Sequence, residues 1–442
     1  MAALSTSSAS PTALTSLYFD ANGTATLNNF IYQDVGQLAL YPTYTGSNAT
    51  GDSGLSLAAV SGNTFIAAPK SFRLNGIPAA PLTAGTPFNV TVTALNQCAT
   101  PAATPNFGQE APTAATVTLV SSNPLPGLGN ATAINQSLGG FSAGQASASL
   151  TWSEVGTIDL SASTTNYLGS GLDASGSQSA VGRFKPAYFD TTVTQACSTF
   201  TYSGQPFAAT VTARAAGGGV TANYAGATWA KGVTLSDAAG GSLGVFTNNT
   251  IAATGFASGV GTASTIAYTF ASRSTPPTSI QVRATDTDGV TSATHGEQAA
   301  ALRSGAFRLG NAYGNEFLKL PIPAYAQYWS AAGWVRNTAD TCTQLTVPSS
   351  ANGGLVFAAQ TTRNQLAAGE TVATMGGTPA GRLVNGDALL SLSAPGAGNF
   401  GYVDIIASKL NAPAWLLQPG DVRACFGACG PRAPIIYSRE RY

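Results

Sequence analysis

The chain of 442 residues carries 19 Lys and Arg against 19 Asp and Glu, so its net charge is zero, and only 9% of its residues are charged. The lack of a basic field to gather phosphates argues against nucleic acid and anionic membrane surfaces as partners. No apolar run reaches the length of about 18 residues that a membrane span needs. With 44% hydrophobic residues, the chain should fold into three or four domains, each with its own core.

The first 70 residues hold only motifs that occur late in the units that follow. Residues 33–36 (QDVG) are echoed by residues 153–156 (SEVG), near the end of the next unit. We therefore expect residues 1–70 to form a partial or N-terminal β-sandwich unit. The first eight residues lack the basic start and apolar centre of a signal peptide. These features suggest a piece of an exported protein.

One strand motif appears twice, almost unchanged. Residues 87–94 (PFNVTVTA) return as residues 206–213 (PFAATVTA), with apolar side chains at alternate positions. This period is typical of strands with one buried face and one face in water. Each copy is followed by a turn-like segment, residues 104–108 (TPNFG) and 221–226 (TANYAG), and then by another alternating strand.

Phenylalanines in similar settings mark the start of each unit. Phe72, Phe184 and Phe307 recur at intervals of about 115 residues, too long for a solenoid repeat and suited to tandem sandwich domains. We expect all three rings to be buried. The predicted domains are a β-sandwich unit at 1–70, immunoglobulin-like (Ig-like) β-sandwiches at 71–182 and 183–304, and a divergent C-terminal β-sandwich at 305–442.

The C-terminal unit keeps β-sheet signals although it departs from the repeat. Residues 383–389 (LVNGDAL) predict a hairpin, because Asn-Gly tolerates the positive φ angles of a type I′ turn. Residues 320–323 (LPIP) should lie on a sheet edge or in a connection, since proline cannot donate to a ladder. The fold class predicted for the whole chain is all-β, with tandem Ig-like β-sandwich domains.

Five cysteines, Cys98, Cys197, Cys342, Cys425 and Cys429, leave many disulfide pairings open. The short separation of Cys425 and Cys429 makes them candidates for one small loop. Zinc needs four converging nitrogen or sulfur ligands, which one histidine and scattered cysteines do not supply. We expect structural cysteines in an oxidising compartment and no cofactor.

Six segments from residue 200 onward carry a family resemblance: 200–207, 283–290, 303–318, 327–329, 340–343 and 436–442. They resemble the C-terminal region of MshQ-like proteins, and the similarity runs from about residue 20 onward. The resemblance implies an exported protein of the mannose-sensitive haemagglutinin (MSHA) type IV pilus system of Gram-negative bacteria. It implies no catalytic residues. The chain departs from the family at Cys425 and Cys429, and it lacks the lectin-like part that often precedes this region.

Catalytic and metal-binding patterns are sparse. Any Ser-His-Asp or Cys-His arrangement must include His295, the single histidine, which lies in a short polar loop and is expected to be exposed. Asp286 and Asp288 flank a turn as in calcium loops, but the further oxygen ligands of an EF-hand are missing. A hairpin turn, in which Asp and Gly supply the backbone angles, accounts for the same residues.

Aromatic residues gather in the last unit. Tyr325, Tyr328, Trp329 and Trp334 fit either core packing, which is common in sandwiches, or a platform for sugars or proteins. We therefore predict a non-enzymatic, extracellular or cell-surface protein that is adhesive or structural. Its expected partners are pilus or other cell-surface proteins, with host or surface glycans as a further candidate. The alternatives are a carbohydrate-binding accessory region of a secreted hydrolase and a catalytic sandwich that acts on polysaccharide.

Overall fold

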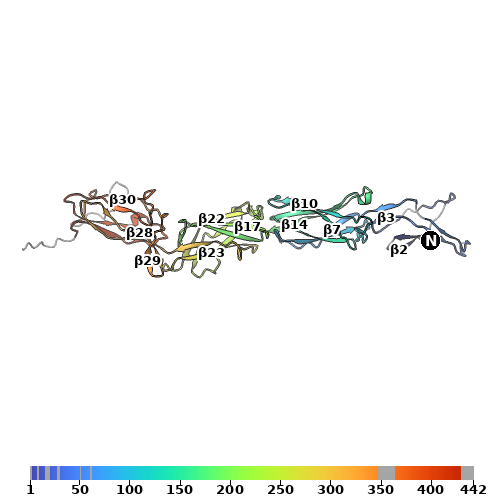
Figure 1. Ribbon diagram of the computed structural model, residues 1–442, viewed down its shortest axis with the longest axis horizontal. Coiled ribbons are helices and arrows are strands. Elements are labelled where there is room, and N and C mark those ends of the chain that lie inside the picture. Colours follow the sequence, from blue (N-terminus) through green and yellow to red (C-terminus); the bar gives the residue numbers. More distant parts are fainter. Residues whose placement is uncertain are drawn as a thin grey trace, which may run out of the picture. The chain divides into compact units, whose positions relative to one another are not determined.

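The computed structural model describes residues 20–26, 30–49, 51–59, 62–346 and 364–429, and the backbone of strands β1 (Ala2–Thr6) and β2 (Ala9–Leu14). The chain is all-β, with tandem Ig-like β-sandwich domains (Figure 1). Helical turns in the described part are short: η1 (Tyr167–Gly169), α1 (Gly226–Trp229), η2 (Ala253–Gly255) and η4 (Ala407–Leu410). These described residues include no helix long and apolar enough to cross a membrane.

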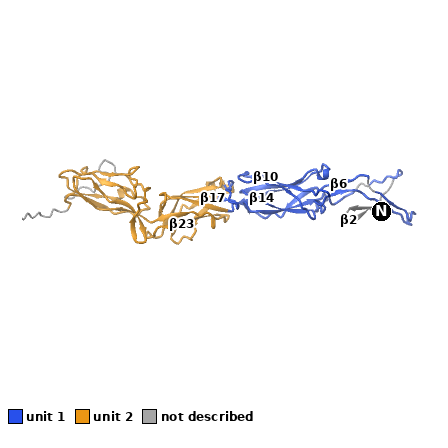
Figure 2. Ribbon diagram, in the orientation of Figure 1, with its two compact units in different colours: residues 1–187, 213–224 blue, residues 188–212, 225–442 orange. Residues whose placement is uncertain are grey.

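The chain divides into two compact units (Figure 2). Unit 1 comprises residues 1–187 and 213–224, and unit 2 comprises residues 188–212 and 225–442. The short segment 213–224 of unit 1 contains the TANY motif, which belongs by chain order to the predicted domain 183–304. Each unit is described by itself.

Unit 1 begins with three small antiparallel sheets, the first of which pairs β1 with β2, and continues with a large one. β3 (Gly36–Leu38) pairs with β6 (Phe65–Ala67), and β4 (Thr43–Thr45) pairs with β5 (Ser56–Ala58). The large sheet has the order β11-β10-β13-β14-β7-β9-β12, and β8 also pairs with β14. Its strands are β7 (Ser71–Asn75), β8 (Leu82–Thr83), β9 (Phe88–Leu95), β10 (Val117–Leu125), β11 (Asn135–Leu138), β12 (Gln145–Leu150), β13 (Gly156–Thr164) and β14 (Ala174–Lys185).

The large sheet closes over one core. β9 contributes Phe88, Val90 and Val92, and the opposite part of the sheet contributes Val117 and Leu119 from β10; all five side chains are buried. The strand predicted from residues 87–94 is thus confirmed as β9. Alternate burial of this kind removes roughly 25 cal/mol of unfavourable hydration per Å² of apolar surface.

Phe107, in the TPNFG turn, contacts two other phenylalanines in this core. Phe107 packs edge-on against Phe72 at 5.4 Å and against Phe141 at 4.8 Å between ring centroids. Gly108 is needed beside them, because its φ is +79° and a Cβ there would lie 2.6 Å from Cβ of Phe141. The TPNFG turn is therefore held by ring packing as well as by hydrogen bonds.

Unit 2 contains two five-stranded sheets and three smaller ones. The first two have the orders β15-β17-β22-β19, with β21 beside β22, and β16-β24-β23-β18-β20. Their strands are β15 (Tyr188–Thr194), β16 (Thr201–Tyr202), β17 (Phe207–Arg214, whose last two residues belong to unit 1), β18 (Val233–Asp237), β19 (Gly244–Thr247), β20 (Thr250–Ile251), β21 (Phe256–Ala257), β22 (Val260–Phe270), β23 (Thr278–Asp286) and β24 (Ala299–Arg303). β17 confirms the second copy of the predicted strand.

The three C-terminal sheets have the orders β25-β28-β29, β26-β33-β32 and β27-β31-β30. Their strands are β25 (Gly305–Leu309), β26 (Ala312–Gly314), β27 (Leu320–Pro321), β28 (Ala324–Ser330), β29 (Gly333–Arg336), β30 (Ala373–Met375), β31 (Leu390–Leu392), β32 (Gly401–Ile405) and β33 (Val422–Phe426). β27 is an edge strand, as the prolines predicted. The predicted hairpin is also present, with φ of 51° at Asn385 and 82° at Gly386.

The three marker phenylalanines are buried as predicted. Phe72 is 4% exposed, Phe184 is fully buried and Phe307 is 2% exposed. The domain limits that we drew from them remain a prediction.

Candidate functional site: carboxylates at the joints between sandwiches

An acidic side chain lies at each of two joints within unit 1. Asp34, in the QDVG motif, accepts hydrogen bonds at Oδ1 from the backbone N–H of Val35 (2.9 Å) and of Asn106 (3.1 Å). Asn106 belongs to the TPNFG turn of the following predicted domain. The amide of Asn96 adds a bond to the carbonyl oxygen of Gln33 at 2.9 Å.

The second joint repeats this arrangement with a stronger set of contacts. Glu154, in the SEVG motif, is fully buried. Its Oε1 accepts the N–H groups of Val155 (2.9 Å) and Asn223 (3.0 Å), and its Oε2 accepts those of Asn130 (3.0 Å) and Ala222 (2.9 Å). A buried carboxylate is stable only when such donors replace water, and charge-assisted bonds are the strong ones.

The side chain of Asn223 extends this second joint. It donates to the carbonyl oxygens of Gly127 (2.7 Å) and Val155 (3.2 Å). In the opposite direction, the amide of Asn130 donates to the carbonyl oxygen of Val220 at 2.9 Å. Two turns far apart in the sequence are therefore fixed to each other through hydrogen bonds to their backbone carbonyl groups.

The sequence shows both halves of this joint but not their contact. The acidic motif (QDVG, SEVG) and the Asn turn (TPNFG, TANYAG) each repeat. In both pairs, all within unit 1, the acid of one predicted domain contacts the Asn turn of the next predicted domain. The signal that could have revealed the pairing is that both motifs repeat together.

The third joint lies within unit 2 and is covalent. A disulfide joins Cys197, before β16, to Cys342, after β29, across a sequence separation of 145 residues. The pairing crosses the predicted boundary at residue 304. Sequence spacing left this pairing open, because only the fold brings the two thiols together.

A buried acid again lies beside this link. Asp340 is fully buried, and its Oδ1 accepts the N–H groups of Cys342 (3.1 Å) and Thr343 (2.9 Å). Its Oδ2 accepts the hydroxyl of Thr343 at 2.7 Å and that of Tyr202, from β16, at 2.9 Å. Burial and the Asp340 charge raise the pKa of Tyr202 well above its ordinary value, so the phenol stays a donor.

Arg303 completes the third joint. Its guanidinium stacks on the rings of Phe200 at 4.5 Å and Tyr328 at 4.9 Å, and it donates to Oδ1 of Asn337 at 2.7 Å. Asn337 in turn donates to the hydroxyl of Tyr202 at 2.6 Å. Phe200 and Tyr202 share one hydrophobic cluster with Phe307 and the other core residues of the C-terminal part.

Among the described residues, one group of side chains is spaced closely enough to hold a metal ion. It comprises Cys197, Asp340 and Cys342, whose ligand atoms lie within 4.8 Å of each other. These side chains do not fit a metal as they stand, because both sulfurs form the disulfide and both Asp340 oxygens accept hydrogen bonds. The arrangement is suited to fixing a joint.

The remaining candidate residues are placed as follows. Cys425 and Cys429 form a second disulfide, and Cys98 is the free cysteine. Oδ1 of Asp286 accepts the N–H groups of Asp288 and Val290, both at 2.9 Å, which is the pattern of a turn. His295 is exposed and stacks on Tyr188 with ring centroids 3.7 Å apart.

The four aromatic candidates separate onto two faces. Tyr325 and Trp329 alternate along β28 with the buried Ala324 and Ala326, so they lie on the outer face, and Trp334 pairs across from Trp329. Tyr328 lies on the opposite face, over Arg303. Three of the four therefore share one surface.

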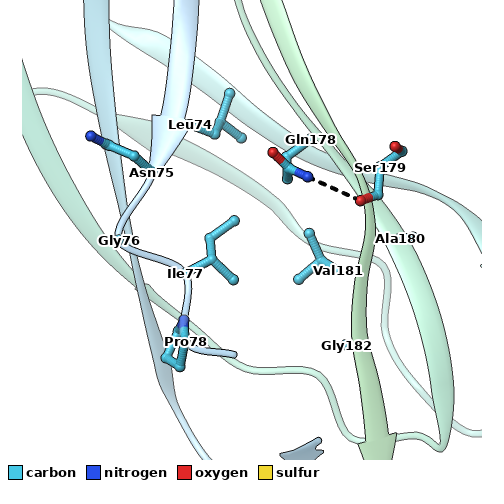
Figure 3. A pocket seen from close by; sticks show the side chains of 10 residues that line it. All are labelled: Leu74, Asn75, Gly76, Ile77, Pro78, Gln178, Ser179, Ala180, Val181 and Gly182. Atoms are coloured by element: carbon cyan, nitrogen blue, oxygen red, sulfur yellow. Dashed lines mark hydrogen bonds between the residues drawn. The ribbon is translucent and has the colours of Figure 1, made fainter. Parts of the chain in front are cut away.

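An open cleft of about 310 Å³ lies between the end of β7 and β14 (Figure 3). The two strands pair at Ser175 and Ser71 and then separate, and β14 next pairs with β8 at Phe184. Ile77 and Val181 face each other across the gap (Figure 3). The cleft has no titratable side chain in its lining and so no means of acid–base chemistry.

Three stretches of the chain match family models. Residues 2–60 match the domain of unknown function DUF6701, first Ig-like domain, residues 154–307 match its third domain, and residues 303–441 match its fourth. The chain carries DUF6701 domains. The DUF6701 match at 154–307 starts at Glu154, the acid of the second joint.

Curated proteins and solved structures were also compared with the chain. No curated protein matches the DUF6701 chain. Among solved structures, the ICAM-5 D1–D4 ectodomain fragment aligns at 12% identity over 82% of this chain and 83% of that chain, with a TM-score of 0.27. A tetra-tandem repeat in the extending region of a large adhesion protein aligns at 14% identity over 92% and 86%, also with a TM-score of 0.27. A TM-score of 0.27 is too low to indicate a shared arrangement of the whole chains.

Proposed function

We propose that this chain is a non-catalytic, extracellular or cell-surface protein that acts as an adhesive or structural component, with its sandwiches held in fixed succession by the three joints. The observation that carries the proposal is that a repeated acidic motif binds a repeated Asn turn at two successive joints. At the third joint, the Cys197–Cys342 disulfide links the two sides. Interfaces between domains are otherwise expected to permit relative motion.

Two features support an exported, non-enzymatic role. Disulfides persist in oxidising compartments, and four of the five cysteines are paired. His295, which any histidine-based triad would require, stacks on Tyr188 at the surface. The finer assignment, to a MshQ-like protein of the MSHA type IV pilus system of a Gram-negative bacterium, belongs to the same proposal and rests on the sequence resemblance.

The experiment is surface labelling of intact cells that express an epitope-tagged full chain, together with an attachment assay on the deletion strain. We expect the tag to be accessible without permeabilisation and the deletion to lower attachment. Complementation with the wild-type chain should restore attachment, whereas a Glu154→Gln chain at the same surface level should restore it less. A tag found only inside the cell, or attachment unchanged by deletion, would refute the proposal.

A further inference from the structure

The outer face of the sheet β25-β28-β29 collects rings and planar polar groups. Phe307 of β25 and Ala326 of β28 point into the core. The alternating positions, which therefore face outward, hold Arg308, Tyr325, Gln327, Trp329, Trp334 and Arg336. We call these six residues the aromatic face.

Its rings are partly open to solvent. Tyr325, Trp329 and Trp334 are each of intermediate exposure, neither core residues nor fully exposed. Trp329 and Trp334 meet at 5.4 Å with an interplanar angle of 83°, so one ring packs its edge against the other. An edge-on pair leaves ring surface for a further contact.

Planar hydrogen-bonding groups lie among these rings. Arg336 stacks over Tyr325 at 4.9 Å and pairs with Asp387, which itself forms a bridge with Tyr325. Gln327 lies directly across from Arg336, and the exposed Arg308 directly across from Tyr325. The Arg336–Asp387 pair cancels its own charge and offers both donors and acceptors, while Arg308 adds one positive charge to the face.

Sugars match this combination of groups. A pyranose ring presents an apolar C–H face, which suits an aromatic ring, and a rim of hydroxyl groups, which suits planar donors and acceptors such as guanidinium, carboxylate and amide. We propose that the aromatic face binds a neutral polysaccharide. The inference rests on the proposed adhesive role, because it supplies the surface through which the joined domains would attach. Asp387 neutralises only one of the two arginines, so the heparin gel described below tests whether Arg308 draws an acidic polysaccharide to the face instead.

The test is affinity gel electrophoresis of the purified full chain in gels that contain mannan, dextran or xylan. Binding retards the chain, and the wild-type chain should be retarded by at least one of the three. Trp334→Ala should weaken that retardation at least tenfold. Gln327→Ala, which leaves the rings in place, should weaken it by a smaller factor. The matched control is Tyr313→Ala, because Tyr313 is 74% exposed in the same part of the chain and lies outside the face.

Three outcomes would overturn the inference: no retardation of the wild-type chain by any neutral polysaccharide, equal losses for Trp334→Ala and Tyr313→Ala, or retardation by heparin alone. Heparin binding that disappears in salt would instead indicate a charge effect. Because purified protein is used, failure here leaves the surface-labelling result untouched. An unchanged far-ultraviolet circular dichroism spectrum and thermal midpoint show that a variant is folded.

Discussion

Glu154 and Asp34 occupy equivalent places in their motifs but use their oxygens differently. Glu154 divides four backbone donors between its two oxygens, whereas Asp34 accepts both of its backbone donors at Oδ1. An amide can imitate a carboxylate that accepts through one oxygen, because its own oxygen takes that place. It cannot imitate one that accepts through both.

We therefore expect Glu154→Gln to destabilise unit 1 by about 1–3 kcal/mol, since two buried N–H groups lose their acceptor whichever way the amide turns. Asp34→Asn should cost clearly less, because the amide oxygen keeps both bonds and only their charge assistance is lost. Chemical denaturation gives the free energies of unfolding. Hydrogen exchange should speed up in Glu154→Gln alone, either at the amides of Asn130 and Ala222 or at those of Val155 and Asn223, according to which way the Gln amide turns. Equal effects of the two variants would disprove this account of the joint.

At the scale of elements, the sequence was informative about strands and silent about contacts between motifs. The alternation in residues 87–94 and 206–213 predicts β9 and β17, because a strand's buried face depends on local period alone. The Cys197–Cys342 pair could not be predicted, since it depends on how β16 and the loop after β29 are brought together. The aromatic face lies between these cases. The sequence shows that Tyr325, Tyr328, Trp329 and Trp334 are close together in the chain, but the alternation of side chains along β28 places Tyr328 on the opposite face of the sheet.

The glycine that ends each acidic motif gives an element-scale prediction. Gly36 has φ of +133°, and the space around its Cβ position is open. Gly156, at the start of β13, has φ of +127°, but a Cβ there would lie 1.8 Å from the carbonyl oxygen of Leu125. Gly36→Ala should cost about 1–2 kcal/mol from backbone strain alone. Gly156→Ala should cost clearly more, because the β10 backbone must also move.

Denaturant midpoints of the two purified variants test this difference. If Gly156→Ala is no more destabilising than Gly36→Ala, then the close approach of β13 to β10 does not exclude a side chain at residue 156.

At the scale of the whole molecule, we propose that the sandwiches on either side of each joint are held together and do not move freely on a flexible linker. Within unit 2, the fastening combines the Cys197–Cys342 bond, the Tyr202–Asp340 hydrogen bond and the Arg303 stack. A cross-link that closes a loop of this length is worth about 4–5 kcal/mol in the chain-entropy model. Gly305 lies within the same packing, since a Cβ there would be 2.4 Å from the ring of Tyr202.

The most direct test is the distance distribution between spin labels at Val245 and Val384, which are exposed and lie on either side of the third joint within unit 2. The labels are attached through noncanonical amino acids, so that the cysteines stay paired. We predict one narrow distribution for the otherwise wild-type chain, and a clearly broader one when Cys197→Ser, Cys342→Ser and Asp340→Ala are combined. A wild-type distribution as broad as that of the triple variant would contradict the account.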